Sequence, residues 1–310
     1  MSGLLERIRA DGVLVADGAM GTLLIARGLP AGAPPESVNL ERPEVLEEIA
    51  GLYLDAGADI VQTNTFGGSP LKLAAYGLAD RAEDVNRAAV TAARRAVAAA
   101  RAHAGGRRAA WVAGSCGPTG RLLEPYGDTR PDEMSESFTR QLRALVEAGV
   151  DAISVETMTD LTEAVLAVRA AKLVAPRIPV FAAMTFDATP RGFFTIMGVD
   201  VARAAAGLAA AGADVVGSNC GNGIETMVAI ARAFATLGAR PLIVQANAGL
   251  PRLEGDAAIY PETPEFMASH AAALIAAGAR VIGGCCGTTP EHIRALRHAV
   301  DRGATDAARA

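Results

Sequence analysis

One short phrase occurs four times along the chain with small changes. It reads DAGADIVQTN at 55–64, EAGVDAISVE at 147–156, AAGADVVGSN at 210–219 and AAGARVIGGC at 276–285. In each copy a helix-forming stretch ends near a glycine, which suits the left-handed conformation that follows the last turn of a helix. An apolar run comes next, as expected of a strand that is buried on both faces. The phrase therefore predicts a repeated helix-to-strand unit.

Four further apolar runs fit the strand position of this unit. They begin at residues 13 (VLVAD), 109 (AAWVAGS), 179 (PVFAAMTF) and 241 (PLIVQANA). Segments with helical spacing separate the strands. Eight such alternations in 310 residues favour an α/β fold, a single (β/α)8 TIM barrel, over a doubly wound open sheet. No linker divides the chain, so we expect the barrel to span residues 1–300 and a polar tail to occupy 301–310.

Composition and charge narrow the classes of partner. The net charge is -5, and no cluster of Lys or Arg alternates with aromatic residues, so a nucleic-acid partner is not expected. The N-terminal segment lacks the apolar core of a signal peptide, and arginines interrupt the alanine-rich run at 88–102. We therefore expect a cytoplasmic protein with small-molecule partners and no membrane contact. In a reducing cytosol, four cysteines indicate metal binding or catalysis rather than disulfides.

Three of the four cysteines fall at the ends of predicted strands. Cys220 ends the sixth strand, and Cys285 and Cys286 end the eighth. The carboxyl ends of all barrel strands meet at one rim, so these three thiols are expected to converge. Thiolates favour zinc, and three protein ligands leave a fourth tetrahedral position open, as in catalytic zinc sites. A lone cysteine is more often a small buried apolar residue, which is the role expected of Cys116.

Two carboxylates also end strands that are otherwise apolar. Asp17 ends the first strand and opens DGAMGT, and Glu156 ends the fourth. Either could cap a helix or pair with a buried cation, but together on one rim with a thiolate zinc they could hold a substrate ammonium. Backbone amides of the GAMG loop could receive a carboxylate. An amino acid with a thiol side chain would satisfy all of these groups.

From about residue 10 to 298 the sequence resembles the zinc-dependent homocysteine S-methyltransferases. GSNCG followed by GGCCGTTPEHI matches the zinc signature of that family. DGAMGT and ADIVQTNTFG are most similar to the homocysteine-binding module of cobalamin-dependent methionine synthase. The resemblance implies an enzyme of methionine biosynthesis that transfers a methyl group to the thiol of L-homocysteine. It also implies that Cys220, Cys285 and Cys286 are catalytic and bind Zn²⁺, and that Asn247 occupies zinc until substrate displaces it.

The resemblance also assigns residues to the substrate. Asp17 and Glu156 would bind the amino group of homocysteine, and amides near Gly18 and Ala19 would bind its carboxylate. Thr157 stands where the betaine-using branch of the family has a tyrosine, which argues against betaine as the methyl donor.

The methyl donor is left open. No folate or cobalamin domain follows the barrel, so we expect a free small molecule or a methylated corrinoid on a separate protein. The leading hypothesis is a split methionine-synthase-like module that uses methylcobalamin on a corrinoid protein. The alternative is a stand-alone enzyme that uses betaine, S-methylmethionine or S-adenosylmethionine, with Tyr126, Phe193 and Phe194 as candidates for a cage around a cationic donor. A third hypothesis is a non-catalytic barrel with a structural or storage zinc site.

Overall fold

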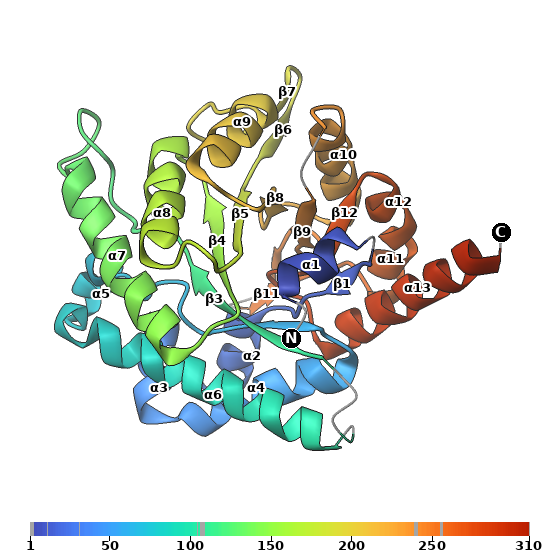
Figure 1. The fold of residues 1–310 in the computed structure, drawn as a ribbon, viewed down its shortest axis with the longest axis horizontal. Helices are drawn as coiled ribbons and strands as arrows, with labels where there is room; N and C mark the ends of the chain where they lie inside the picture. The colour runs from blue at the N-terminus through green and yellow to red at the C-terminus, as the bar shows by residue number, and fades with distance from the viewer. Residues whose placement is uncertain are drawn as a thin grey trace.

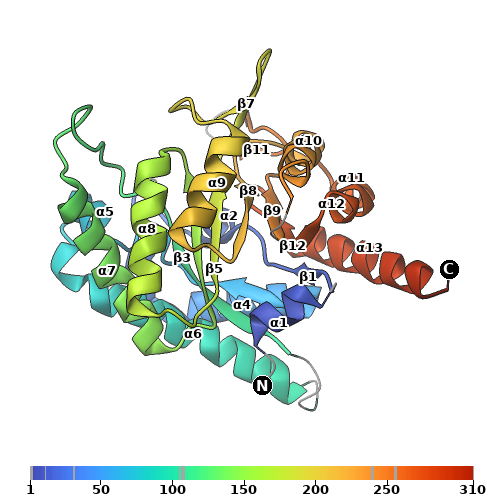
Figure 2. The ribbon, with the colours of Figure 1, turned by 45° about the horizontal axis from the view of Figure 1, so that its top comes forward.

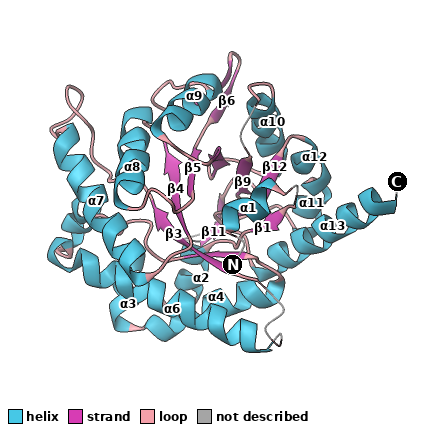
Figure 3. Cartoon of the chain, in the orientation of Figure 1, coloured by secondary structure: helices cyan, strands magenta, loops and turns pink. Residues whose placement is uncertain are grey.

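The chain folds into a ring of strands surrounded by helices (Figures 1 and 3). The structure is a computed structural model that describes residues 3–10, 12–30, 32–103, 105, 109–238, 241–254 and 257–309. The strands of the ring are β1 (Leu14–Val15), β2 (Ile60–Gln62), β3 (Trp111–Cys116), β4 (Ala152–Met158), β5 (Val180–Met184), β8 (Val215–Asn219), β9 (Leu242–Ala246) and β12 (Ala279–Gly284). Each of the eight predicted strands is present.

All eight strands run parallel in one sheet, in the order β1-β12-β9-β8-β5-β4-β3-β2. A parallel bridge between Ala16 and Ile60 joins the first strand of this order to the last, so the sheet closes on itself. Two backbone bonds support the closure, from the Asp17 amide to the Ile60 carbonyl at 2.9 Å and from the Asp59 amide to the Val15 carbonyl at 2.7 Å. The predicted (β/α)8 TIM barrel is confirmed, and a doubly wound open sheet is excluded.

Helices follow the strands and cover the outside of the barrel (Figures 2 and 3). The larger ones are α4 (Pro43–Ala56), α6 (Ala82–His103), α7 (Pro131–Ala148), α8 (Leu161–Val174), α9 (Val201–Ala211), α10 (Ile224–Ala235) and α13 (Pro290–Arg309). The shorter ones are α1 (Leu4–Arg9), α2 (Met20–Ala26), α3 (Val38–Glu41), α5 (Pro70–Leu73), α11 (Pro264–Ser269) and α12 (Ala271–Ala276). Short 3₁₀ turns lie at Pro35–Ser37, Ala74–Tyr76 and Ala79–Arg81.

Glycines end the helical part of each repeated phrase, as predicted. Gly57, Gly149, Gly212 and Gly278 have φ values of 111°, 97°, 107° and 91°. A side chain with a Cβ atom is strained in this left-handed region, which explains why each copy of the phrase carries glycine there.

Apolar residues form two layers of core. One layer lies between the strands and the outer helices, and the other fills the interior of the barrel. The interior layer includes small residues such as Ala16 and Ala152, and Leu4 and Ile8 of α1 pack against it. Figure 1 shows α1 across the ring of strands, so this helix covers the amino-terminal end of the barrel.

In three copies of the repeated phrase an aspartate directly precedes the strand, and the three aspartates make the same two kinds of contact. In each, the Oδ2 atom accepts a hydrogen bond from a backbone amide of the neighbouring strand and forms an ion pair. We call Asp59, Asp151 and Asp214 the base carboxylates. The amides are those of Val15, Val112 and Val180, at 2.9, 2.8 and 2.9 Å. The cations are Arg297, Arg94 and Lys172, at 2.9, 2.8 and 2.5 Å.

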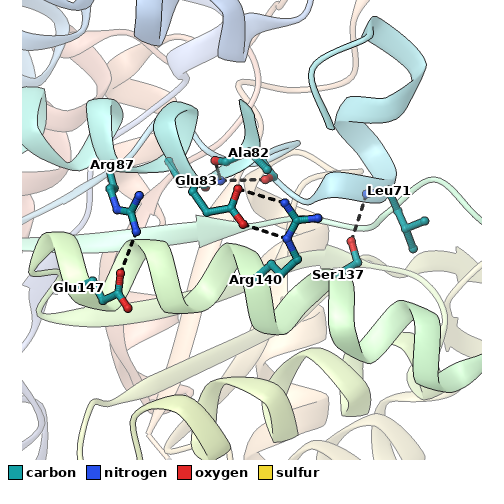
Figure 4. A network of polar contacts seen from close by, with 9 residues as sticks. Leu71, Ala82, Glu83, Arg87, Ser137, Arg140 and Glu147 are labelled. Carbon is teal, nitrogen blue, oxygen red and sulfur yellow. Dashed lines mark hydrogen bonds and ion pairs between the residues drawn. The ribbon is translucent and has the colours of Figure 1, made fainter. Parts of the chain in front are cut away.

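Polar contacts also join neighbouring outer helices, as Figure 4 shows for α6 and α7. Arg140 donates to both carboxylate oxygens of Glu83, at 2.8 and 3.1 Å. Arg87 and Glu147 form a second pair at 2.9 Å. The Arg87–Glu147 pair is exposed and the Arg140–Glu83 pair is half-buried, so each is expected to contribute only a little to stability.

Two loops after strands contain short antiparallel hairpins that the sequence pattern did not predict. They are formed by β6 (Asp187–Thr189) with β7 (Gly192–Phe194) and by β10 (Arg252–Glu254) with β11 (Ala257–Ile259). Strands of three residues are too short to give a recognisable alternation in the sequence. In Figures 1 and 2 the β6–β7 hairpin projects beyond the body of the barrel.

The helix α13 runs through the position where the polar tail was expected to begin. It spans Pro290–Arg309, while Ala310 and residues 1–2 lie outside the described part of the chain. The domain boundary at residue 300 stays a prediction. None of the described helices combines the length and the apolar character needed to cross a bilayer.

Candidate active site

Three thiols meet at the carboxyl end of the barrel. The Sγ atoms of Cys220, Cys285 and Cys286 all lie within 4.8 Å of one another. The Cys220 and Cys286 Sγ atoms are 3.8 Å apart. Sulfur ligands of a tetrahedral zinc with Zn–S bonds of about 2.3 Å are about 3.8 Å apart, so the donor set and its spacing fit zinc. Within the described residues no histidine or carboxylate joins this group, which leaves a fourth position for another ligand.

The end of β9 holds the two cysteine segments in register. The Cys220 amide donates to the Gln245 carbonyl at 3.1 Å, and the Cys285 amide donates to the Ala246 carbonyl at 2.7 Å. Cys220 has a φ of 60°, which is unusual for a residue that is not glycine. Such a conformation persists only where surrounding bonds impose it, and it is common at functional sites.

The thiols differ in their acidity. Hydrogen bonds from the Cys220 and Cys285 thiols lower the pKa of Cys286 well below its usual value. Hydrogen bonds with Cys220 and Cys286, together with burial, raise the pKa of Cys285.

Asn247 follows β9, between the two strands that carry the cysteines, whereas Cys116 ends β3 farther round the barrel. Asn247 is 4% exposed, and its Oδ1 atom is buried without a hydrogen-bond partner. No hydrogen bond joins its side chain to the thiols among the described residues, so its role as a metal ligand stays a prediction. Cys116 is fully buried in the core, where its Sγ lies 3.4 Å from Gln141 Oε1, and it is not part of the thiol group.

A cavity of about 450 Å³ opens beside the thiols and contains the other predicted substrate residues. Asp17, Gly18, Ala19 and Glu156 line it together with the three cysteines. The sequence placed these residues at one rim, and the structure brings them into one cavity. Asn247 is not among the residues that line it.

The carboxylates in this cavity, Asp17 and Glu156, are here called the rim carboxylates. They are 2% and 7% exposed, and neither forms an ion pair with a described Lys, Arg or His. Burial raises the pKa of Asp17 to about 8 and that of Glu156 to about 7. The Asp17 Oδ1 atom is buried without a partner. Two adjacent acidic groups without a cation suit a ligand that brings a positive charge.

Asn219, which precedes Cys220, was not singled out in the sequence. Its side chain accepts a hydrogen bond from the Thr157 amide at 2.7 Å and donates to Thr157 Oγ1 at 2.8 Å. Thr157 has a φ of 58°, and the register of β4 against β5 shifts at this point. A bulge of this kind turns a side chain toward a site. Asn219 thus fixes the strand end that carries Glu156 next to the one that carries Cys220.

Two backbone amides of the loop after β1, those of Gly18 and Ala19, differ in their hydrogen bonding. The Ala19 amide donates to Thr288 Oγ1 at 3.1 Å, and that hydroxyl donates to the Cys285 carbonyl at 2.7 Å. The Gly18 amide donates to no described residue. A Cβ atom at Gly18 would lie 2.6 Å from Thr288 Oγ1, which explains the glycine. Gly18 is therefore the more available donor for a substrate carboxylate.

The aromatic residues near the cavity are not the ones expected. Phe66 and Tyr76 line it, whereas Tyr126, Phe193 and Phe194 do not. Tyr126 is 81% exposed on the β3–α7 loop. The three candidate cage residues therefore do not line this cavity, and a role for them at a cationic donor stays a prediction.

Comparisons with known proteins agree with this geometry. The family model for homocysteine S-methyltransferase matches residues 14–300. The methionine synthases of Mycobacterium leprae and Mycobacterium tuberculosis are both 38% identical, over 96% and 93% of this chain. The chain spans only 25% and 24% of those proteins. The crystal structure of the homocysteine methyltransferase MmuM from Escherichia coli, in a metallated form, matches with a TM-score of 0.79 at 27% identity and covers 95% of this chain and 99% of MmuM.

The structure is thus a TIM barrel whose rim cavity contains three converging thiols and two buried carboxylates. The chain belongs to the homocysteine S-methyltransferase family, an enzyme family, as its sequence predicted.

Proposed function

We propose that the protein transfers a methyl group to the thiol of L-homocysteine and forms methionine, with Zn²⁺ bound by Cys220, Cys285 and Cys286. The observation that carries this proposal is the shared cavity, in which the three thiols face two carboxylates that lack a cation. Homocysteine has a thiol and an ammonium group separated by a short chain, which matches these two regions.

Each group of the cavity has a separate task in this reaction. Zinc bound by three thiolates would hold the homocysteine sulfur as a thiolate at neutral pH. Asp17 and Glu156 bind the ammonium group, and the Gly18 amide donates to the carboxylate. The substrate sulfur then forms a bond to the methyl carbon while the donor loses its bond to that carbon. By fixing both ends of homocysteine, the cavity leaves its sulfur a single line of approach to the donor.

A methylated corrinoid on a separate protein or domain is our leading proposal for the donor. The sequence identity to the two methionine synthases, 38%, is higher than the 27% identity to MmuM, which supports this proposal. The rim loops also expose large apolar side chains, which suit contact with another protein. Those with exposed fractions above 50% are Leu122, Tyr126, Ile196, Leu250 and Leu253.

The alternative donor is a free small molecule such as betaine, S-methylmethionine or S-adenosylmethionine. Phe66 and Tyr76 in the cavity favour it, since aromatic rings attract the positive charge of a sulfonium or quaternary ammonium. Thr157, which stands where the betaine-using branch has a tyrosine, argues against betaine as the donor. A cytoplasmic location also stays a proposal.

The test is methionine formation from homocysteine by the purified, zinc-loaded protein. Methylcobalamin, betaine, S-methylmethionine and S-adenosylmethionine are offered separately. Turnover with methylcobalamin alone would support the corrinoid proposal, and turnover with one small cation would support the stand-alone enzyme. No methionine with any donor, together with no binding of homocysteine, would favour a structural or storage zinc site.

A further inference from the structure

One glutamine contacts both rim carboxylates. Gln62 ends β2, and its backbone amide donates to Asp17 Oδ2 at 2.7 Å. Its side-chain Nε2 donates to Glu156 Oε1 at 2.8 Å. The Ser115 hydroxyl donates to the same Glu156 oxygen. A single residue thus engages one oxygen of each carboxylate.

A second glutamine fixes the direction of this amide. Gln245 Nε2 donates to Gln62 Oε1 at 2.7 Å. A carboxylate only accepts hydrogen bonds, so Gln62 must turn its NH₂ group to Glu156 and its oxygen to Gln245. Gln245 must then donate, and its own Oε1 is left buried without a partner. With Glu156 ionised, this orientation of the Gln245–Gln62–Glu156 chain is the one that gives both polar atoms of the Gln62 side chain a partner.

The free oxygens define what remains for a ligand. Asp17 Oδ1 has no partner, and Glu156 Oε2 has only a long contact of 3.5 Å from Asn219 Nδ2. Both carboxylates line the same cavity. An ammonium group donates three hydrogen bonds and matches a site with several free acceptors.

We propose that Gln62 is a positioning residue that aims the free oxygens of Asp17 and Glu156 at the substrate ammonium, and that Gln245 holds Gln62 in the required orientation. This inference rests on the proposed function. It adds an explanation for the residue type, because a neutral amide orients both carboxylates without neutralising them. A lysine or arginine at position 62 would pair with the carboxylates and compete with the substrate.

The test compares two ligands that differ only in the amine. Binding of L-homocysteine and of 4-mercaptobutanoate, which lacks the amino group, is measured by calorimetry on the zinc-loaded protein. The variants are Gln62→Met, which keeps the length of the side chain without its amide, and Gln245→Met. Gln141→Met is the matched control, because Gln141 is also a buried glutamine but bonds to the Thr65 and Ser115 carbonyls.

We expect Gln62→Met to weaken homocysteine binding by roughly 10- to 100-fold, as for loss of a hydrogen bond to a charged group, and to change the binding of 4-mercaptobutanoate by less than about twofold. Gln245→Met should cause a smaller loss of roughly three- to tenfold, again only for homocysteine, since Gln62 keeps its own amide. Gln141→Met should affect the two ligands equally.

Equal losses for both ligands in Gln62→Met, or no loss for either, would overturn the positioning role. If Gln62→Met does not fold, Gln245→Met decides by the same criterion. Failure of the wild-type protein to bind homocysteine would instead overturn the proposed function, and the positioning role with it.

Discussion

Acidic side chains have different partners at the two ends of the barrel: cations at the half-buried base carboxylates and neutral groups at the buried rim carboxylates. At the amino-terminal end each base carboxylate accepts a backbone amide and pairs with a cation, as Asp214 does with Lys172 at 2.5 Å. At the carboxyl end Asp17 and Glu156 are at least as buried, yet no described cation pairs with them. Their partners are neutral amides and a hydroxyl.

This difference separates stability from binding. A buried carboxylate that keeps its cation strengthens the fold or costs it little, whereas one without a cation costs stability until a ligand supplies the charge. The base carboxylates therefore help to hold the strands in register, whereas the rim carboxylates lack a cation that a ligand could supply. Each of the following tests asks whether these two roles can be separated.

The largest effect is expected from Cys286→Ser. Loss of one thiolate ligand should remove zinc and lower methionine formation by about 10³-fold or more, because a metal contributes several kcal/mol to catalysis. Stability should change little, since Cys286 lies on a partly exposed rim segment. Zinc content, turnover and thermal unfolding are measured together.

Cys116→Ser is the control for that variant, because this cysteine is fully buried in the core. It should lower the free energy of unfolding by about 1–3 kcal/mol and retain zinc. If Cys286→Ser destabilised the protein as much as Cys116→Ser does, the zinc site would have to be regarded as structural.

Glu156→Gln should weaken homocysteine binding by roughly 10- to 100-fold, because a charged acceptor for the ammonium is lost. Zinc content should not change. The free energy of unfolding at pH 8 should stay the same or rise, since a buried charge without a cation has been removed. Calorimetric titration with homocysteine and denaturant unfolding provide both values. An unchanged affinity would remove Glu156 from the ammonium site.

Asp214→Ala should have the opposite effects: it should lower the stability of the fold and leave homocysteine binding nearly unchanged. Loss of the Val180 amide bond and the Lys172 ion pair should lower the free energy of unfolding by about 2–3 kcal/mol. Homocysteine affinity should stay within about twofold of wild type. Urea unfolding and calorimetry measure the two effects.

The control is Asp132→Ala, which breaks the exposed ion pair with Arg130. That change should cost less than about 0.5 kcal/mol. A large loss of affinity in Asp214→Ala, with stability intact, would contradict the separation of the two ends.

The smallest effect concerns pH. The pKa values of Asp17 and Glu156 are raised by burial to about 8 and about 7, so the folded state binds protons more tightly than the unfolded state. Their contribution to stability is fully present below pH 4 and is lost as the pH rises through about 7 to 8. Without substrate, the free energy of unfolding should therefore fall by at least about 1 kcal/mol between pH 6 and 9 on their account.

The combined variant Asp17→Asn, Glu156→Gln should have a shallower slope than wild type over this range. Comparing the two proteins removes the contribution of the thiols, which both contain. Identical slopes would show that the rim carboxylates do not titrate there.

The strands and the main site residues could be predicted because their signals are local. Each strand is a short apolar run next to a glycine or a polar loop, and parallel strands bring their carboxyl ends to the same side of the fold. Cys220, Cys285, Cys286, Asp17 and Glu156 were noticeable because thiols and carboxylates are rare at the ends of apolar runs.

The supporting residues could not be predicted because their roles depend on partners far away in the sequence. Gln62 and Gln245 are 183 positions apart, and glutamine at a strand end is unremarkable by itself. The use of the Ala19 amide by Thr288 depends on contact between the first and last loops. That Tyr126, Phe193 and Phe194 do not line the cavity could not be predicted for the same reason, since the direction of a long loop is set by its packing.

The closure between β1 and β2 has a consequence for the motions of the protein. β1 contains two residues, and among the described residues one bridge joins this segment to β2, so this seam pairs fewer residues than the other neighbouring strands do. The Asp17 side chain continues the ladder by accepting the Gln62 amide. Exchange of the Gln62 amide with solvent deuterium should therefore slow when a ligand binds Asp17. Local opening of the β1–β2 seam would then be coupled to ligand binding in the cavity.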